Sequence, residues 1–247
     1  MRVAVSLFIV VVVASLSATA AARDVVTFRS GPMAPFTAWP ENTTVLRWHG
    51  RHRAVVDGLD RAALFASSGA LVERIDADLP CDGAPKNNAT RLRLFIEELV
   101  ASGSGNLSLV GGDPRAAGVC AREWVPGYDF SAWRAGDDAQ DDGNATGCAD
   151  LLLAVRVLGA DSGVGYASDL AAAVAWASGA VSFPVGGRRL VGEGLVLAVA
   201  GEGECPPFLD AALAQALAAG ASLHIGDTGG DTTLFFPSNC PALNYDF

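Results

Sequence analysis

The sequence predicts an α/β protein built around a parallel sheet, because strand-like and helix-like segments alternate along the chain. The unit at residues 194–225 shows this best: an apolar run at 195–200 leads through a turn to Pro206-Pro207 and a helix-forming segment at 208–219. Proline suits the first turn of a helix, and Gly220 can end one. A second apolar run follows, so this unit predicts two parallel strands joined by a right-handed crossover.

The alternation occurs at least four times, which is typical of α/β proteins. The expected strands are residues 45–48, 71–79, 107–110, 195–200, 222–225 and 232–236, with a hairpin from 180–183 to 189–191. The expected helices are residues 54–67, 88–101, 114–120, 149–158, 166–178 and 208–219, whereas residues 23–40 read as irregular. The clearest helix is 88–101, because its apolar residues recur at helical spacing. They are Leu92, Phe95, Ile96 and Leu99.

Two architectures fit these elements. One is a compact or incomplete TIM-like (β/α) barrel, since a complete barrel typically uses about 250 residues. The alternative is an open doubly wound parallel sheet. Residues 23–247 are expected to form a single α/β domain with a long loop insertion at about 121–147, which is first aromatic and then acidic.

The amino-terminal residues 1–22 have the pattern of a secretory signal peptide: Arg2, then an apolar run, then small residues at a cleavage site. The apolar run is shorter than the roughly 20 residues that a membrane span needs. We therefore expect a cleaved, glycosylated protein that is secreted or held in the lumen of the secretory pathway. Four N-glycosylation sequons agree with this, and they begin at Asn42, Asn88, Asn106 and Asn144.

The net charge narrows the classes of partner. The chain carries a formal charge of −10, and phosphate backbones and anionic membranes repel such a protein. Nucleic acid and membrane surfaces are therefore not expected as partners once the signal peptide is removed. Carbohydrate, as a neutral ligand, fits the charge, and cations remain open as well. The sequence leaves the oligomeric state undetermined.

The cysteines indicate an oxidised protein. Two disulfides and one free thiol are expected in an oxidising compartment, and the sequence leaves their pairing open. The spacing of the cysteines does not resemble a zinc site, so neither a metal nor a cofactor is expected. The odd count keeps a thiol-dependent enzyme as a minor alternative. The five positions are Cys81, Cys120, Cys148, Cys205 and Cys240.

Carboxylates follow several of the expected strands, and in a barrel these strand ends face one common mouth. Glycoside hydrolysis requires two carboxyl groups, one to protonate the leaving oxygen and one to attack or to activate water. Acidic residues after strands also serve as helix caps and turn formers, so each one has a structural alternative. The candidate catalytic residues are Asp76, Asp113, Glu202, Glu204 and Asp227.

Three further side chains are candidates for binding a sugar. Trp48 and Trp124 fall near expected strand ends or in the long loop, and aromatic faces suit the apolar face of a pyranose ring. His224 lies in an apolar strand just before Asp227, where it acts either as an acid or base or as an ordinary core residue. Ordinary core packing is the alternative for both tryptophans.

Several common catalytic motifs do not occur. The segment 226–230 lacks the Gly-Lys-Ser/Thr of a phosphate-binding loop, and the chain has no Gly-x-Ser-x-Gly elbow. The triplet Asp227-Thr228-Gly229 resembles that of aspartic proteases, but no second such triplet occurs. These observations disfavour nucleotide hydrolysis, serine hydrolysis of the α/β-hydrolase type and aspartic proteolysis.

The order of motifs resembles secreted or cell-surface (β/α)-barrel proteins related to glycoside hydrolases. The matching positions are Arg74-Ile75-Asp76, the helix from Leu92 to Leu99 and Gly112-Asp113-Pro114, over about half of the mature chain. This resemblance implies a carbohydrate-active protein, in which Glu202 or Glu204 opposes one of the aspartates. The chain has no acidic cluster on a central strand, where such proteins usually carry one, so a non-catalytic secreted binding or interaction protein on the same scaffold is the alternative.

Overall fold

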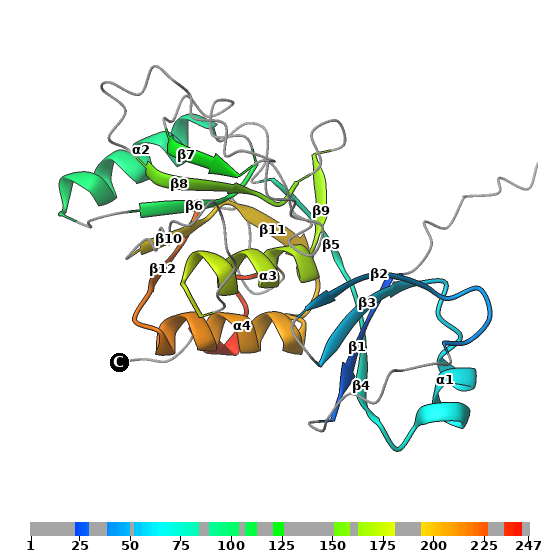
Figure 1. Ribbon diagram of the computed structural model, residues 1–247. Helices are drawn as coiled ribbons and strands as arrows, with labels where there is room; N and C mark the ends of the chain where they lie inside the picture. The colour runs from blue at the N-terminus through cyan, green and yellow to red at the C-terminus, as the bar shows by residue number, and fades with distance from the viewer. Residues whose placement is uncertain are drawn as a thin grey trace, which may run out of the picture.

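The computed structural model describes residues 23–29, 39–49, 52–83, 89–103, 107–112, 121–125, 151–158, 163–180, 194–226 and 235–243. Over these residues the chain is a mixed α/β structure with one parallel and two antiparallel sheets (Figure 1). The α/β class is therefore confirmed. The TIM-like barrel is not confirmed, because the described strands are divided among three sheets of four, five and four strands.

The first sheet is antiparallel and is built from the amino-terminal part of the chain. Its order is β2 (Thr44–His49), β3 (Arg53–Asp57), β1 (Arg23–Phe28) and β4 (Val72–Ala77). One face packs on helix α1 (Arg61–Ser68) through a small core that includes Val26, Val56 and Leu64. On the opposite face, Val25 and Val55 join the main core of the protein. The sheet is thus buried on both sides.

The second sheet is parallel and has five strands. Its order is β12 (Ser222–Ile225), β10 (Gly194–Leu197), β6 (Leu107–Gly111), β8 (Leu151–Arg156) and β7 (Ala121–Val125). The expected unit of parallel strands at 194–225 is confirmed, because β10 and β12 pair directly in parallel, with Val196 opposite His224.

Helices cover both faces of this parallel sheet (Figure 1). Helix α2 (Ala89–Ala101) lies on one face, where Ile96 packs with Leu109 and Val196. Helices α3 (Ala167–Ala177) and α4 (Pro207–Ala218) lie on the other, against the larger core that includes Val110 and Leu195. Successive strand residues point to opposite faces, so a strand covered on both sides must be apolar throughout.

The third sheet is antiparallel and includes the carboxyl-terminal strand β13 (Phe235–Phe236), which pairs with β11 (Val199–Glu202). Its order is β13, β11, β5 (Pro80–Gly83) and β9 (Val164–Tyr166). The short 3₁₀ helix η2 (Pro241–Leu243) follows. The ring of Phe236 lies where a side chain on Gly201 would have to go, since a Cβ there would be 1.9 Å from the ring.

The apolar run at 195–200, expected as one strand, belongs to two sheets. The chain leaves the parallel sheet at Ala198, whose N–H donates to the carbonyl of Val110, and it enters β11 at Val199. Gly111 permits this close approach, because a Cβ on it would lie 3.1 Å from the Cβ of Ala198. The sequence could not show the break, since both halves are equally apolar.

Four segments have a different secondary structure from the one that the sequence predicted. Residues 23–28 form strand β1 instead of an irregular segment, and 121–125 form strand β7 instead of a loop. Residues 53–57 form strand β3, and the helix begins only at Arg61, where the Asp60 carboxylate accepts a hydrogen bond from the N–H of Ala63. The expected helix at 149–158 is strand β8. A buried parallel strand and a buried helix are both continuous apolar runs, so periodicity alone does not separate them.

Strands β5 and β9 and the short helix η2 were not expected. The other described helices and strands agree with expectation in type, with ends shifted by a few residues. The expected signal peptide at 1–22, the helix at 114–120, the hairpin at 180–191 and most of the long insertion lie outside the described residues. No helix in the described part of the chain is long and apolar enough to cross a membrane.

Candidate functional site

The carboxyl edge of the parallel sheet is the first place to look for a site. The chain enters this sheet at the central strand β6, adds β7 and β8 on one side, and then adds β10 and β12 on the other. The order of strands therefore reverses beside β6. In open α/β sheets, ligands bind in the crevice outside the carboxyl ends of the strands at such a reversal.

Two candidate carboxylates continue directly from this edge. Asp113 follows Gly112, just beyond the end of β6, and Asp227 follows Gly226, just beyond the end of β12. Both aspartates lie outside the described residues. Strands β6 and β12 flank β10, and neighbouring strands lie about 4.8 Å apart, so these two strands are about 9 to 10 Å apart. The described sheet thus brings both strand ends to one edge.

Glu202 and Glu204 belong to a different part of the fold. Glu202 is the last residue of β11 in the antiparallel third sheet, and Glu204 lies in the turn before α4. Both side chains are exposed. The sequence suggested that they follow a strand of the parallel sheet, but that strand ends at Leu197, so they are offset from its carboxyl edge.

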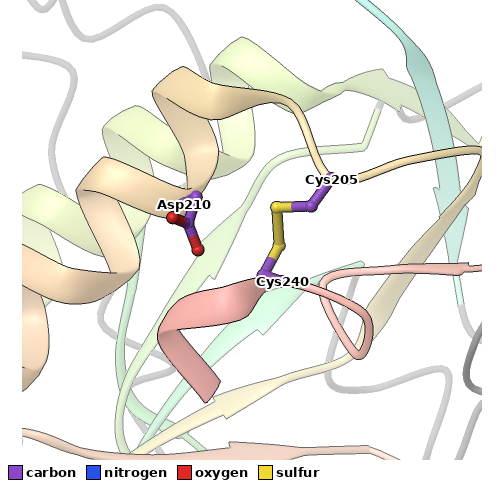
Figure 2. Close-up of side chains that lie close together, drawn as sticks. All are labelled: Cys205, Asp210 and Cys240. Carbon is purple, nitrogen blue, oxygen red and sulfur yellow. A yellow bond between two sulfur atoms is a disulfide. The ribbon is translucent and has the colours of Figure 1, made fainter. Parts of the chain in front are cut away.

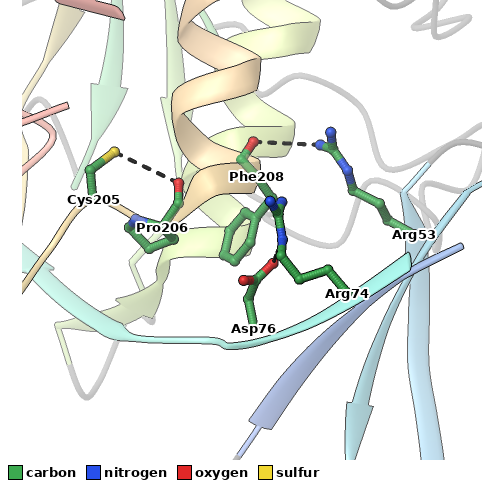
Figure 3. Close-up of polar contacts among 6 residues, drawn as sticks. All are labelled: Arg53, Arg74, Asp76, Cys205, Pro206 and Phe208. Atoms are coloured by element: carbon green, nitrogen blue, oxygen red, sulfur yellow. Dashed lines mark hydrogen bonds and ion pairs between the residues drawn. The ribbon is translucent and has the colours of Figure 1, made fainter. Parts of the chain in front are cut away.

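Asp76 lies on the amino-terminal sheet, where it pairs with arginine. Its carboxylate accepts a hydrogen bond of 2.7 Å from Nε of Arg74 on the same strand. Beside this pair, Nη1 of Arg53 donates to the carbonyl of Phe208 at 3.5 Å, which links the amino-terminal sheet to the first turn of α4 (Figure 3). Burial, and then the charge of Arg74, lowers the pKa of Arg53, whereas Asp76 and Glu73 oppose that shift. Asp76 is therefore the ion-pair partner of Arg74 beside this junction.

The candidate sugar-binding residues are on separate strands. The backbone of Trp48 lies in β2 and that of Trp124 in β7, in two different sheets, and their side chains are not among those described. His224 lies in β12, where its ring meets Phe95 of α2 edge-on with centroids 6.5 Å apart. Burial lowers the pKa of His224, and its Nε2 has no hydrogen-bond partner among the described residues. It therefore packs as a neutral ring on the α2 face.

The sequence did not reveal a buried polar network at the start of α3. Asp78 accepts hydrogen bonds from the N–H and the hydroxyl of Ser168, at 2.9 and 2.7 Å, and forms an ion pair of 3.4 Å with Nε of Arg23. The guanidinium of Arg23 also lies 3.7 Å from the centre of the Tyr166 ring. In the sequence, Asp78 is one of several acidic residues near the end of an expected strand, and nothing distinguishes it from the others. Its contacts are those of a helix cap supplied by a distant strand.

One thiol lies next to this network. Cys81 in β5 is free and buried. Burial, followed by the charges of Asp169, Asp78 and Asp82, raises the pKa of Cys81 well above that of an ordinary thiol. A thiol that remains protonated is a poor nucleophile. Within the described part of the chain, the geometry of Cys81 is therefore that of a core residue.

A disulfide, expected from the cysteine count, is present beside α4. Cys205, just before α4, is bonded to Cys240, just before η2. The side chain of Asp210 points toward this disulfide from the first turn of α4 (Figure 2). Its Oδ1 accepts a hydrogen bond of 2.7 Å from the N–H of Ala242. The disulfide and this hydrogen bond together hold the carboxyl-terminal segment against α4.

Comparison with known proteins adds no assignment. No protein-family model matches the chain, and no curated protein matches it in sequence. The class of the molecule therefore rests on the fold itself, which is an α/β protein with a parallel sheet covered by helices on both faces. The resemblance to barrel proteins related to glycoside hydrolases stays an expectation from short motifs.

Proposed function

We propose that this chain is a secreted carbohydrate-active protein whose ligand site lies at the carboxyl edge of the parallel sheet. The supporting observation is the strand order β12-β10-β6-β8-β7, which reverses beside β6. That reversal is where ligands bind in open α/β sheets. Gly112 follows β6 at this point, and a residue without a side chain lets a ligand approach the backbone.

The chemistry at this edge suits a neutral polyol. The whole chain carries a charge of −10, which disfavours phosphorylated and other anionic ligands. Carboxylates accept hydrogen bonds from sugar hydroxyls, and Asp113 and Asp227 are the acidic residues that continue from β6 and β12. Carbohydrate is therefore the ligand class that we assign to the site.

The spacing of the strands favours one mode of hydrolysis. Inverting glycosidases place their two carboxyl groups roughly 6.5 to 9.5 Å apart, and retaining ones about 5 to 5.5 Å apart. Two strands separated by a third lie about 9 to 10 Å apart, which is closer to the inverting arrangement. We therefore propose Asp113 and Asp227 as the acid and base of an inverting glycoside hydrolase.

A second candidate is a binding protein without catalysis. The observation that favours it concerns the other three candidate carboxylates. Glu202 and Glu204 are exposed, and Asp76 pairs with Arg74 on a different sheet. Exposed carboxylates, and a carboxylate paired with arginine, lack the apolar surroundings in which a catalytic general acid usually lies. On this alternative, the same edge of the sheet holds a glycan and does not cleave it.

One experiment separates the two candidates. The purified secreted protein is assayed on a glycan panel for both binding and hydrolysis, beside Asp113→Asn and Asp227→Asn. Each variant is expected to lose at least about a hundredfold in turnover, as general acid–base groups do. Glu202→Gln and Glu204→Gln are the matched controls, and both should retain full turnover.

The outcomes have different consequences. Inversion at the anomeric carbon, followed by NMR, supports the proposed pair. Full turnover in both aspartate variants removes these two residues from the mechanism. Glycan binding without turnover supports the binding protein, and a protein that neither binds nor cleaves any glycan overturns the carbohydrate assignment.

A further inference from the structure

The cluster of Cys205, Asp210 and Cys240 brings three possible metal ligands of two types, thiol and carboxylate, close together (Figure 2). Their ligand atoms lie within 4.8 Å of one another, and they come from the segment before α4, the first turn of α4 and the residue before η2. No other group of three such side chains converges in this way within the described part of the chain. Cys205 and Asp210 are half-buried, and Cys240 is buried.

We propose that reduction of the Cys205–Cys240 disulfide converts this cluster into a binding site for a zinc-type divalent cation. Reduction by an external dithiol breaks the S–S bond. Each sulfur gains an electron and a proton, and the dithiol leaves as its own disulfide. Binding of Zn²⁺ then displaces one proton from each thiol. The oxidised protein takes no metal at this site, because its sulfurs are bonded to each other.

The geometry agrees with the bond lengths of such a centre. Zinc lies about 2.3 Å from a thiolate sulfur and about 2.0 to 2.2 Å from a carboxylate oxygen, so tetrahedral ligand atoms are separated by less than about 4 Å. The Cα atoms of the two cysteines are 5.0 Å apart, so only side-chain rotations are needed to open the sulfurs around an ion. Three protein ligands leave the fourth position to water.

The surroundings of Asp210 also suit a metal ligand. Its Oδ1 accepts the N–H of Ala242, and hydrogen-bonded carboxylates are the rule at metal centres, since the second contact fixes their orientation. No described group donates to its Oδ2, so that oxygen is available. Two thiolates and one carboxylate favour Zn²⁺ over Ca²⁺ or Mg²⁺, which prefer oxygen ligands only.

Cobalt provides the test, because thiolate-bound Co²⁺ gives a charge-transfer absorption band. The full chain is reduced with a phosphine, freed of reductant without oxygen, and titrated with Co²⁺. The band is expected in the reduced wild type and in Cys81→Ser, and it should be absent from the oxidised protein. Added Zn²⁺ should displace the cobalt and remove the band.

The isosteric variant Asp210→Asn decides the role of the carboxylate. The amide keeps an oxygen for the N–H of Ala242 but loses the charge, so its Co²⁺ affinity should fall at least about tenfold. Its disulfide should still form on oxidation, as mass spectrometry can check. The double variant Cys205→Ser/Cys240→Ser should lose the band. Any one of three results overturns the proposal. The first is a band that persists in the double variant, and the second is a Co²⁺ affinity of Asp210→Asn equal to that of the wild type. The third is the absence of the band from the reduced wild type, whether or not reduction unfolds the chain.

Discussion

Asp78 and Ser168 are ninety residues apart in sequence, yet the carboxylate of Asp78 accepts hydrogen bonds from both the backbone N–H and the hydroxyl of Ser168. The Asp78 side chain is fully buried, and Arg23 is its cationic partner. The first turn of α3 is therefore capped by a residue from the segment that joins β4 to β5. This contact fastens the amino-terminal sheet to the helix that covers the parallel sheet.

Replacement of Asp78 is expected to be strongly destabilising. Asp78→Ala leaves the N–H and hydroxyl of Ser168 without their acceptor and Arg23 without its counter-charge, and loss of one partner of a buried ion pair costs about 3 to 5 kcal/mol. Ser168→Ala removes one hydrogen bond but keeps the ion pair, so it should cost only about 1 kcal/mol. Urea unfolding of both variants measures the difference. Equal free energies of unfolding would show that the Asp78 carboxylate has no special role in capping α3.

The disulfide is expected to stabilise the native fold. It closes a loop of 35 residues, for which the chain-entropy model gives about 3 to 4 kcal/mol. The double variant Cys205→Ser/Cys240→Ser should lose about that amount in free energy of unfolding. Wild type unfolded in the presence of reductant also loses the second expected disulfide, so it should be no more stable than the variant. If the double variant unfolds at the same urea concentration as the oxidised wild type, the disulfide does not stabilise the fold.

Cys81 should resist alkylation while the protein is folded. Burial and three neighbouring carboxylates raise its pKa, so the thiol stays protonated at neutral pH and is also shielded from reagent. Iodoacetamide at pH 8 should leave Cys81 unmodified in the native protein and label it completely in guanidinium, as read by peptide mass spectrometry. Rapid labelling in the native state would contradict this.

The same peptide map tests the cysteine pairing. It should recover Cys205 joined to Cys240. The sequence predicts one further disulfide, and Cys81 is free, so the second bond is expected between Cys120 and Cys148, which lie outside the described residues. A native Cys81 peptide bonded to either of them would show that this assignment is wrong.

His224 should make the protein less stable in mild acid. Its native pKa is lowered from 6.5 by burial, so the unfolded chain binds a proton more readily than the folded one. The contribution is fully present above pH 6.5 and is lost as the pH falls through the lowered native pKa. His224→Gln should reduce the loss of stability in that range and leave the stability at pH 8 nearly unchanged. Urea midpoints between pH 8 and pH 5 provide the measurement, and identical pH profiles would exclude this role.

The sequence alone determined the α/β class and the strongest local units. Helix α2 was predictable because Leu92, Phe95, Ile96 and Leu99 recur at helical spacing. The β10–α4–β12 unit was predictable because prolines and a glycine mark the ends of its helix. The cysteine count correctly indicated a disulfide. These signals are local, so neighbouring residues are sufficient to produce them.

Only the tertiary structure decided which strands pair, and therefore which candidate residues share an edge. The segment Leu151–Arg156 is apolar enough for either a buried helix or a buried strand. It forms strand β8, which pairs in parallel with β6. Asp76 and Glu202 each lie near the end of an expected strand, as Asp113 and Asp227 do, but their strands belong to antiparallel sheets. Sheet membership depends on long-range hydrogen bonding and packing. For that reason, acidic residues that look alike in the sequence lie in or follow strands of three different sheets.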